Sequence, residues 1–213
     1  MKPYYEDGSV TLYLGDCREV QEWLGADVLV TDPPYGLGYG TRYDHLDRDV
    51  VGDADTIVRD EALSFWGTRP ALVFGNWRRP RPPQARTRLV WDKGEEAGLG
   101  GVGPFMPRDE EIYVLGEGWT GPRRSNVFRV NAIRNSGELR DALDHPTPKP
   151  VTLMEELLKC CPPGTVADPF AGTGSTLIAA RNLGRLAIGV EIVERYCELI
   201  ATRLGQQSLG LSA

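Results

Sequence analysis

The C-terminal part of the chain alternates between strand-like and helix-like segments, and this alternation constrains the fold more than any other feature. The pattern predicts a strand at 165–167, a glycine-bearing turn at 168–174 and a helix at 175–183. A second strand is predicted at 185–190 and a second helix at 193–204. Strands that alternate with helices form parallel sheets covered by helices on both faces. We therefore expect an α/β fold with a mainly parallel, doubly wound sheet.

The rest of the chain supplies further elements for the same sheet. Strands are predicted from apolar and β-branched runs at 9–14, 27–31, 71–74, 88–91 and 110–115. Helices are predicted at 18–24, at 55–66 and after Pro150. Irregular structure is expected in a mobile loop at 36–53, in the proline-rich 78–83, in the weakly patterned 116–144 and in a frayed tail from Gln206. The 213 residues suffice for a single domain, 1–213, in which 116–144 is a short insertion.

Composition excludes several classes of protein. The cysteines lack a CxxC pair and a nearby histidine set, so we expect neither a metal site nor a disulfide framework; they are Cys17, Cys160, Cys161 and Cys197. The sequence has no charged-then-apolar leader and no apolar run approaching about 18 residues, so we expect no signal peptide and no membrane span. The expected compartment is a reducing cytoplasm.

The net charge of −6 is unevenly distributed along the chain. Residues 76–140 hold 12 basic and 8 acidic side chains, whereas the remaining residues hold 12 basic and 22 acidic ones. A local basic surface attracts phosphate even when the whole protein is acidic. We therefore expect the middle segment to contact DNA, the alternative being that its arginines are only solvated.

The turn Asp168-Pro-Phe-Ala-Gly-Thr-Gly174 has the composition of a nucleotide-binding loop. Gly172 and Gly174 let the backbone approach a ligand, and the helix that follows adds N–H donors and the positive end of its dipole. Glu191 ends the next predicted strand, where a carboxylate can accept both hydroxyls of a ribose. The GxGxxG pattern of pyrophosphate binding is absent, so a cofactor with adenosine but no phosphates, such as S-adenosylmethionine, fits better. An ordinary tight turn is the alternative interpretation.

Asp32-Pro33-Pro34-Tyr35 follows a predicted buried strand, at the end of the sheet where ligands bind in open α/β folds. The two prolines make this turn rigid and leave carbonyls with no adjacent N–H. The Asp32 carboxylate and the Pro33 carbonyl can accept both N–H groups of an exocyclic amino group, and so direct its lone pair toward an incoming methyl group. Tyr35 offers a flat face on which a base can stack. No nucleophilic cysteine is required. A proline turn capped by aspartate is the alternative.

The pairing of Thr31-Asp-Pro-Pro-Tyr-Gly36 with Asp168-Pro-Phe-Ala-Gly-Thr-Gly-Ser175 resembles the amino-directed DNA methyltransferases, which methylate adenine N6 or cytosine N4. Asp32-Pro33-Pro34-Tyr35 precedes Gly172 and Gly174 in the sequence. In this family, that order of the catalytic and cofactor-binding motifs is typical of the β class, a circularly permuted subclass. Other similar pieces are Leu14-Gly-Asp-Cys17, Trp91-Asp-Lys93 and His145-Pro-Thr-Pro-Lys-Pro150. The resemblance implies a circularly permuted methyltransferase sheet that binds S-adenosylmethionine.

The resemblance also implies a role for each part of the two motifs. Asp32 and Pro33 would hold the target amino group, Pro34 would complete the turn, and Tyr35 would stack on a base extruded from the duplex. Glu191 would bind the ribose of the cofactor. The other residues implied to bind the cofactor are Asp16 at its adenine, Thr147 and Lys149 near its carboxylate, and Asp168, Phe170, Ala171, Gly172, Thr173 and Gly174 around its methionine part.

The same resemblance implies double-stranded DNA as the substrate. The candidate DNA contacts are Arg78, Arg79, Arg81, Arg123, Arg124, Arg129 and Arg134, of which the last four could reach guanine edges or only phosphates. The segment 116–144, which should read the DNA sequence, is short for this family. Recognition would therefore involve either a short site or a homodimer.

Three alternatives remain for the function. The DPPY form favours adenine N6 by resemblance, and cytosine N4 is the runner-up because both bases present an amino group to the same acceptors. Methylation of RNA or of a protein glutamine amide is a second alternative, although those relatives usually carry the cofactor glycines first. A catalytically silent DNA-binding or cofactor-binding module is the third, and the intact Asp32, Tyr35 and Glu191 argue against it.

Overall fold

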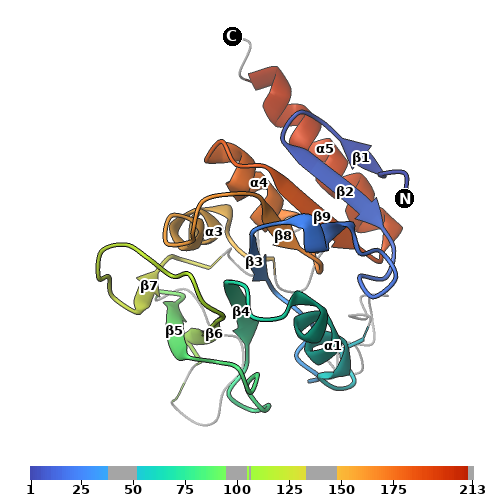
Figure 1. Cartoon of the computed structure of the whole chain (residues 1–213). Coiled ribbons are helices and arrows are strands. Elements are labelled where there is room, and N and C mark those ends of the chain that lie inside the picture. The colour runs from blue at the N-terminus through green and yellow to red at the C-terminus, as the bar shows by residue number, and fades with distance from the viewer. Residues whose placement is uncertain (38–51, 95–104, 106, 133–147, 211–213) are drawn as a thin grey trace.

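The computed structural model of this chain describes residues 1–37, 52–94, 105, 107–132 and 148–210, and of 207–210 only the backbone. Within this part of the chain, the strands form one nine-stranded sheet in the order β1-β2-β9-β8-β3-β4-β6-β5-β7 (Figure 1). Most of the predicted mobile loop, 38–51, and the end of the predicted insertion, 133–144, lie outside the described residues.

The middle of the sheet is parallel, as the sequence predicts. The strands are β1 (Tyr5–Glu6), β2 (Val10–Leu14), β3 (Val28–Thr31), β4 (Ala71–Gly75), β5 (Thr87–Asp92), β6 (Asp109–Leu115), β7 (Val127–Arg129), β8 (Val166–Asp168) and β9 (Ala187–Glu191). Neighbours from β2 through β9, β8 and β3 to β4 all pair in parallel. Strand β6 is antiparallel to β4 and β5, and β1 is antiparallel at the other edge. The mainly parallel α/β sheet is confirmed, whereas the circular permutation stays a prediction.

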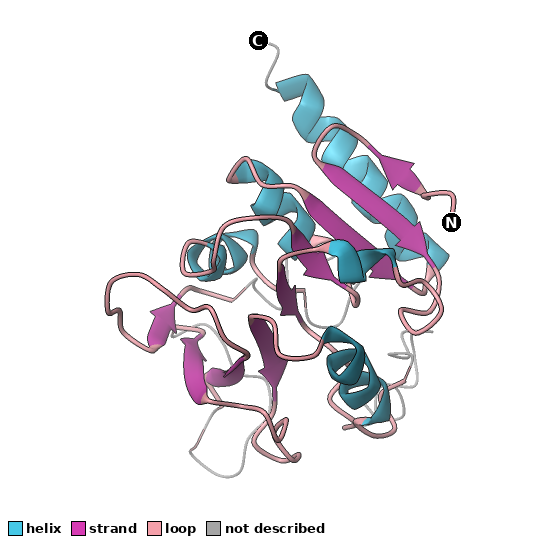
Figure 2. Ribbon diagram, viewed as in Figure 1, coloured by secondary structure: helices cyan, strands magenta, loops and turns pink. Residues whose placement is uncertain are grey.

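Helices cover both faces of this sheet (Figure 2). They are η1 (Glu22–Gly25), a 3₁₀ helix, and α1 (Ile57–Trp66), α3 (Val151–Leu158), α4 (Ser175–Asn182) and α5 (Glu194–Gly210). Val28 and Val30 of β3 belong to a core cluster with residues of α3, α4 and α5. Leu29, on the opposite face, belongs to a second cluster that includes the stacked rings of Trp23 and Trp66. Because successive side chains of a strand point to opposite faces, these clusters are the two cores of a doubly wound sheet.

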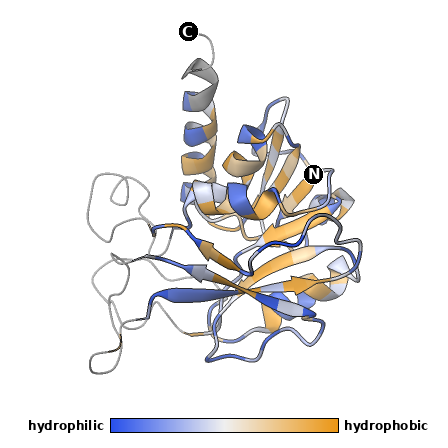
Figure 3. Ribbon diagram, turned by 90° about the vertical axis from the view of Figure 1, so that its left-hand side faces the viewer, coloured by the Kyte–Doolittle hydropathy of each residue, from blue (hydrophilic) through white to orange (hydrophobic). Residues whose placement is uncertain are grey.

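Hydrophobic residues concentrate on the central strands, whereas the loops and parts of β5 and β6 are hydrophilic (Figure 3). The central strands β3 and β4 are buried along their whole length. Strands buried on both faces consist of continuous apolar runs without alternation, which explains why Asp27–Thr31 and Ala71–Phe74 were predictable.

The helix predicted at 18–24 is wrong. The chain forms turns after Asp16 and then only the short η1. The Asp16 carboxylate accepts the N–H of Arg18 at 2.9 Å, and the Trp23 indole donates to the Cys17 carbonyl at 2.9 Å. Such local hydrogen bonds between side chains and the backbone compete with the backbone hydrogen bonds of a regular α-helix.

The frayed tail predicted from Gln206 is also wrong as far as Gly210, where α5 ends, and residues 211–213 lie outside the described residues. The amphipathic pattern ends at Leu204, but adding residues to a formed helix costs little compared with starting one. Two edge strands were not predicted, β1 and β7, since segments of two or three residues are too short to show a period.

In the described part of the chain, none of the helices is long and apolar enough to span a membrane. The same residues include no group of histidine, cysteine and acidic side chains placed to hold a metal ion. All four cysteines are free, and burial raises the pKa of the Cys17 thiol to about 12. A thiol with so high a pKa is a poor nucleophile at neutral pH.

Candidate active site

The two motifs singled out in the sequence meet at the centre of the sheet. Strands β3 and β8 are parallel neighbours, so the turns that follow them emerge at the same edge. The Thr31 hydroxyl at the end of β3 donates to the Asp168 carboxylate at the end of β8, with 2.7 Å between the oxygens, and both side chains are buried. After β8 the chain continues to β9 on one side of this strand pair, and after β3 it continues to β4 on the other side. The strand order therefore reverses between β8 and β3, and ligands bind at such a reversal in open α/β sheets.

Both carboxylate oxygens of Asp32 have partners. The Tyr35 hydroxyl donates to Oδ1 at 2.6 Å, and the Lys149 ammonium donates to Oδ2 at 2.5 Å. Burial raises the pKa of the Asp32 carboxyl, and Lys149 opposes that rise. A carboxylate oxygen can accept more than one hydrogen bond, so Asp32 retains acceptor capacity for a further N–H group.

A second carboxylate, Glu110 of β6, shares Lys149 with Asp32. Its Oε2 lies 3.3 Å from the Lys149 ammonium and 3.4 Å from the Tyr35 hydroxyl, while its Oε1 lies 2.6 Å from the ammonium of Lys93. Burial works against the charge on Glu110, but Lys149 and Lys93 outweigh it and lower the pKa of this carboxyl. Burial also opposes the charge on Lys149, but Asp32 and Glu110 outweigh it and raise the pKa of the ammonium. Two ammonium groups thus balance two carboxylates in the site.

Sequence reasoning missed Glu110. Glu110 is the middle one of three consecutive acidic residues at the start of β6, 109–111, and such residues are usually solvated. Lys149 was predicted near the carboxylate of a cofactor. The described contacts of its ammonium are instead with Asp32 and Glu110, and its carbonyl accepts the Ser175 hydroxyl at 2.7 Å. Its predicted role toward the cofactor stays a prediction, and Thr147 lies outside the described residues.

Replacing Lys149 with methionine should destabilise the fold and shift the pH dependence of any reaction at Asp32. The Lys149 side chain is only 6% exposed, and removing one partner of a buried ion pair costs about 3–5 kcal/mol. Without the ammonium, the pKa of Asp32 rises further, so the ionised carboxylate is lost at a higher pH and the acid limb of the activity profile moves upward.

The measurements are denaturant unfolding and the pH profile of turnover. The matched control is Lys159→Met, since Lys159 forms an exposed pair with Glu156. An unchanged acid limb in Lys149→Met would contradict the coupling between Lys149 and Asp32.

The glycine turn bonds directly to Glu191. The Gly172 N–H donates to Glu191 Oε2 at 2.7 Å, and the Val193 N–H donates to Oε1 at 2.9 Å. Within the turn, the Phe170 N–H donates to Asp168 at 3.2 Å. Burial raises the pKa of Glu191 to about 7 and that of Asp168 to about 6. The sequence predicts Ala171 and Thr173 as further parts of this turn, and both are buried there.

Asp16 lies at the same edge of the sheet, just beyond β2. Leu14 is the β-ladder partner of Glu191, so Asp16 comes two residues past that partner. Its carboxylate binds the Arg18 guanidinium at 2.5 Å and caps the following turn, and Arg18 lowers its pKa. A contact of Asp16 with an adenine stays a prediction.

Replacing Gly174 with alanine should destabilise the protein in two ways, through backbone strain at a positive φ and through a steric clash of the new Cβ. Gly174 has φ +81, and an added Cβ would lie 2.8 Å from the Ile200 side chain. A left-handed residue other than glycine costs about 1–2 kcal/mol. The control is Gly184→Ala, at φ +68 with no atom within 4 Å of the new Cβ. Denaturant unfolding should show a larger loss for Gly174→Ala, and equal losses would mean that Ile200 relaxes freely.

The predicted DNA-contacting arginines divide into two groups. Arg78, Arg79 and Arg81 follow β4, the neighbour of β3, and Arg79 donates to the Gly36 carbonyl next to Tyr35. Arg129 ends β7 and lies 3.3 Å from Asp92. The structure brings these four to the edge of the sheet that carries the motifs, since β7, β5 and β4 run in the same direction.

Arg123 and Arg124 do not join the group at that edge. Both are exposed and precede β7. Arg124 interacts with Cys160, just after the end of α3, whereas Lys149 precedes the start of that helix. A contact of these two arginines with DNA stays a prediction. Arg134 lies outside the described residues.

Comparisons with known proteins agree with this geometry. A family model described as "DNA methylase" (N6_N4_Mtase) matches residues 90–202. "Putative methylase YubD" of Escherichia coli (strain K12) is 31% identical over 212 residues, which cover 92% of this chain and 88% of that protein. The "crystal structure of M1.HpyAVI-SAM complex" superposes with a TM-score of 0.65 at 19% identity, covering 92% of this chain and 98% of the other. "PvuII DNA methyltransferase (cytosine-N4-specific)" superposes with a TM-score of 0.63 at 15% identity, covering 95% and 88%.

Proposed function

The chain belongs to the N6/N4 family of DNA methylases, and from this membership we propose that it methylates the N6 amino group of adenine in double-stranded DNA. One observation carries the proposal, the hydrogen bond between Thr31 and Asp168. This bond joins the turn at 32–35, which offers acceptors for an amino group, to the turn at 168–174, which fits a nucleoside cofactor. A transfer between two bound molecules requires their sites to be adjacent in this way.

S-adenosylmethionine, the cofactor of this family, supplies an electrophilic methyl group. The residues at the glycine turn fit it. Glu191 is a buried carboxylate at the tip of β9 that can accept ribose hydroxyls, and the positive φ values of Gly172 and Gly174 bring backbone close to the edge of the sheet. We assign the turn from Asp168 to Gly174 to the methionine part.

Asp32 and the Pro33 carbonyl would hold the two N–H groups of the target base, with Tyr35 against the base. As the amino nitrogen bonded to the methyl carbon, the carbon–sulfur bond of the cofactor would break with its electron pair left on the sulfur, and the Asp32 carboxylate would stabilise the positive charge gained by the nitrogen. The N–H proton would then leave the nitrogen, with the Asp32 carboxylate as its acceptor. Lys149 and Tyr35 fix the orientation of Asp32 through one bond to each oxygen.

Adenine is favoured over cytosine by the DPPY form of the motif. The fold does not separate the two, since the PvuII DNA methyltransferase, described as cytosine-N4-specific, has the same fold. A single domain with a target-reading segment at 116–144 and a cytoplasmic location also belong to the proposal, and recognition would use either a short site or a homodimer.

The test is to offer DNA and RNA to the protein with methyl-labelled S-adenosylmethionine and then identify the labelled nucleoside. We expect label in 6-methyladenine from DNA. Label in 4-methylcytosine would show that the target is cytosine N4 instead of adenine N6. Label only in RNA or in protein would contradict both assignments.

A further inference from the structure

Trp77 is a large aromatic side chain exposed beside the candidate active site. It is 72% exposed and follows β4 by two residues. Strand β4 pairs in parallel with β3, and Val73 is the partner of Thr31, so Trp77 and the Asp32 turn leave the sheet at the same edge. An indole exposed to this extent gains free energy when a partner covers it, and tryptophan is enriched at contact hot spots.

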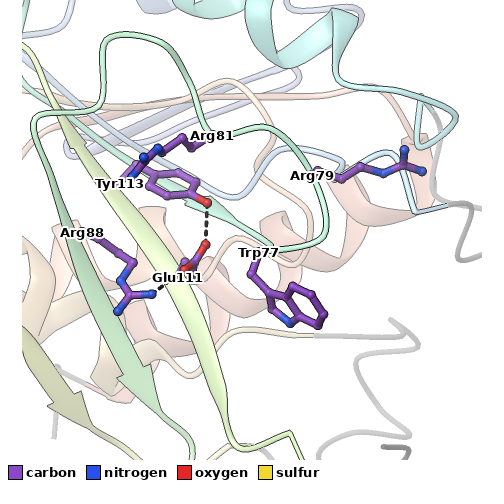
Figure 4. A pocket seen from close by; sticks show the side chains of 6 residues that line it. All are labelled: Trp77, Arg79, Arg81, Arg88, Glu111 and Tyr113. Atoms are coloured by element: carbon purple, nitrogen blue, oxygen red, sulfur yellow. Dashed lines mark hydrogen bonds and ion pairs between the residues drawn. The ribbon is translucent and has the colours of Figure 1, made fainter.

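The surroundings of Trp77 are positively charged. We name residues 76–81 the Trp77 loop. With β5 and β6 this loop lines an open cavity of about 320 Å³, whose lining residues are Trp77, Arg79, Arg81, Arg88, Glu111 and Tyr113 (Figure 4). Glu111 is the one acidic residue of the lining, and Arg88 binds it at 2.6 Å. The lining therefore keeps an excess of positive charge, which suits a polyanion.

The Trp77 loop is attached to the turn that carries the acceptors. The Arg79 guanidinium donates to the Gly36 carbonyl, one residue after Tyr35. The Arg78 guanidinium lies 5.4 Å from the centre of the Trp77 ring, a cation–π distance that steadies the indole. A polyanion held by this loop would thus lie next to the target-base site.

An exposed aromatic side chain beside the site can offset the cost of extruding a base from a duplex. A target base can reach Asp32 only after leaving the duplex, and unstacking it costs a few kcal/mol. Stacking of an aromatic ring on a base returns about 1–3 kcal/mol, and apolar wedges between base steps are a known device of DNA-bending proteins.

Resting on the proposed DNA substrate, we propose that the Trp77 loop binds the duplex beside the target base. The Trp77 indole stacks on a base that remains in the helix when the target base is extruded, and the arginines of the loop hold the flanking phosphates. Trp77 is thus a positioning residue that stabilises the extruded state without touching the reacting amino group.

The test compares the full chain with Trp77→Ala and Trp77→Phe, each with S-adenosylmethionine. The DNA is a short duplex containing the recognition site, which is first mapped from DNA methylated by the wild type. A second duplex carries an abasic site opposite the target base, so that the target is unpaired. Phe65→Ala is the matched control, because Phe65 is another exposed aromatic residue, 45% exposed on α1. Thermal unfolding checks that every variant is folded.

We expect Trp77→Ala to lose about 10- to 100-fold in kcat/KM on the paired duplex, the equivalent of one lost stacking contact. On the abasic duplex the loss should shrink to less than about 2-fold, because little extrusion energy remains to be offset. Trp77→Phe should lie between, and Phe65→Ala should match the wild type.

Full activity of Trp77→Ala on the paired duplex, or an equal loss on both duplexes, would overturn the inference. If the wild type methylates cytosine instead, the adenine assignment fails while this comparison stands, since it is made on whichever base is methylated.

Discussion

Replacing Asp32 with alanine is expected to lower methyl transfer by about 10²–10³-fold or more while S-adenosylmethionine still binds. The variant removes a charged acceptor that stabilises positive charge at the amino nitrogen, an electrostatic contribution typically of that size. Cofactor affinity should survive because the glycine turn contacts Glu191 rather than Asp32. Single-turnover transfer and calorimetric cofactor binding measure the two effects separately.

Asp32→Asn is the matched variant for this prediction. It keeps the size of the side chain and one oxygen, but it removes the negative charge and leaves Lys149 with only Glu110. We expect it to be nearly as inactive as the alanine variant. Transfer by either variant near the wild-type rate would show that Asp32 does not hold the target amino group.

Replacing Glu191 with glutamine should weaken cofactor binding by about 10- to 100-fold, because hydrogen bonds to a charged group contribute roughly 1.5–3 kcal/mol. The affinity for the cofactor should depend on pH in the wild type but not in Glu191→Gln. Burial raises the pKa of Glu191 to about 7, so the carboxylate is ionised above neutral pH and protonated below it. The ionised form is the better acceptor for ribose hydroxyls, and wild-type affinity should fall as the pH drops through about 7. Titration calorimetry across this range should show a flat profile for Glu191→Gln.

The contribution of Glu191 to folding stability should depend on pH in the opposite direction to its contribution to cofactor affinity. Because the pKa in the folded state lies above the unfolded value, the contribution of this group to stability is present at low pH and is lost as the pH rises through about 7. Asp168, with its pKa raised to about 6, acts in the same sense at slightly lower pH. A parallel loss of affinity and stability on acidification would contradict the assignment of the pH effect to Glu191.

The central sheet and the two motifs could be predicted because their signals are local. A continuous apolar run marks β3, the prolines after Asp32 mark a rigid turn, and the glycines after Asp168 mark a helix start. Each of these follows from a few consecutive residues. The adjacency of the two turns could be expected from the rule that parallel strands end at one edge.

Contacts between distant strands could not be predicted. Glu110 reaches Lys149 only because β6 reverses direction beside β4, and no local pattern encodes that pairing. Arg124 precedes β7 whereas Arg129 ends it, and charge along the sequence does not show at which end of a strand an arginine lies. Trp77 carries no local signal either, since its importance lies in its exposure.

The most direct measurement of the central claim is the nucleoside composition of DNA from a bacterial host without its own DNA methylases. The host expresses either the wild-type chain or Asp32→Ala, and the digested DNA is analysed by mass spectrometry. We predict 6-methyladenine with the wild type and a level lower by about 10²-fold or more with Asp32→Ala. Unmethylated DNA from both strains, with the wild-type protein folded and bound to S-adenosylmethionine, would contradict the account.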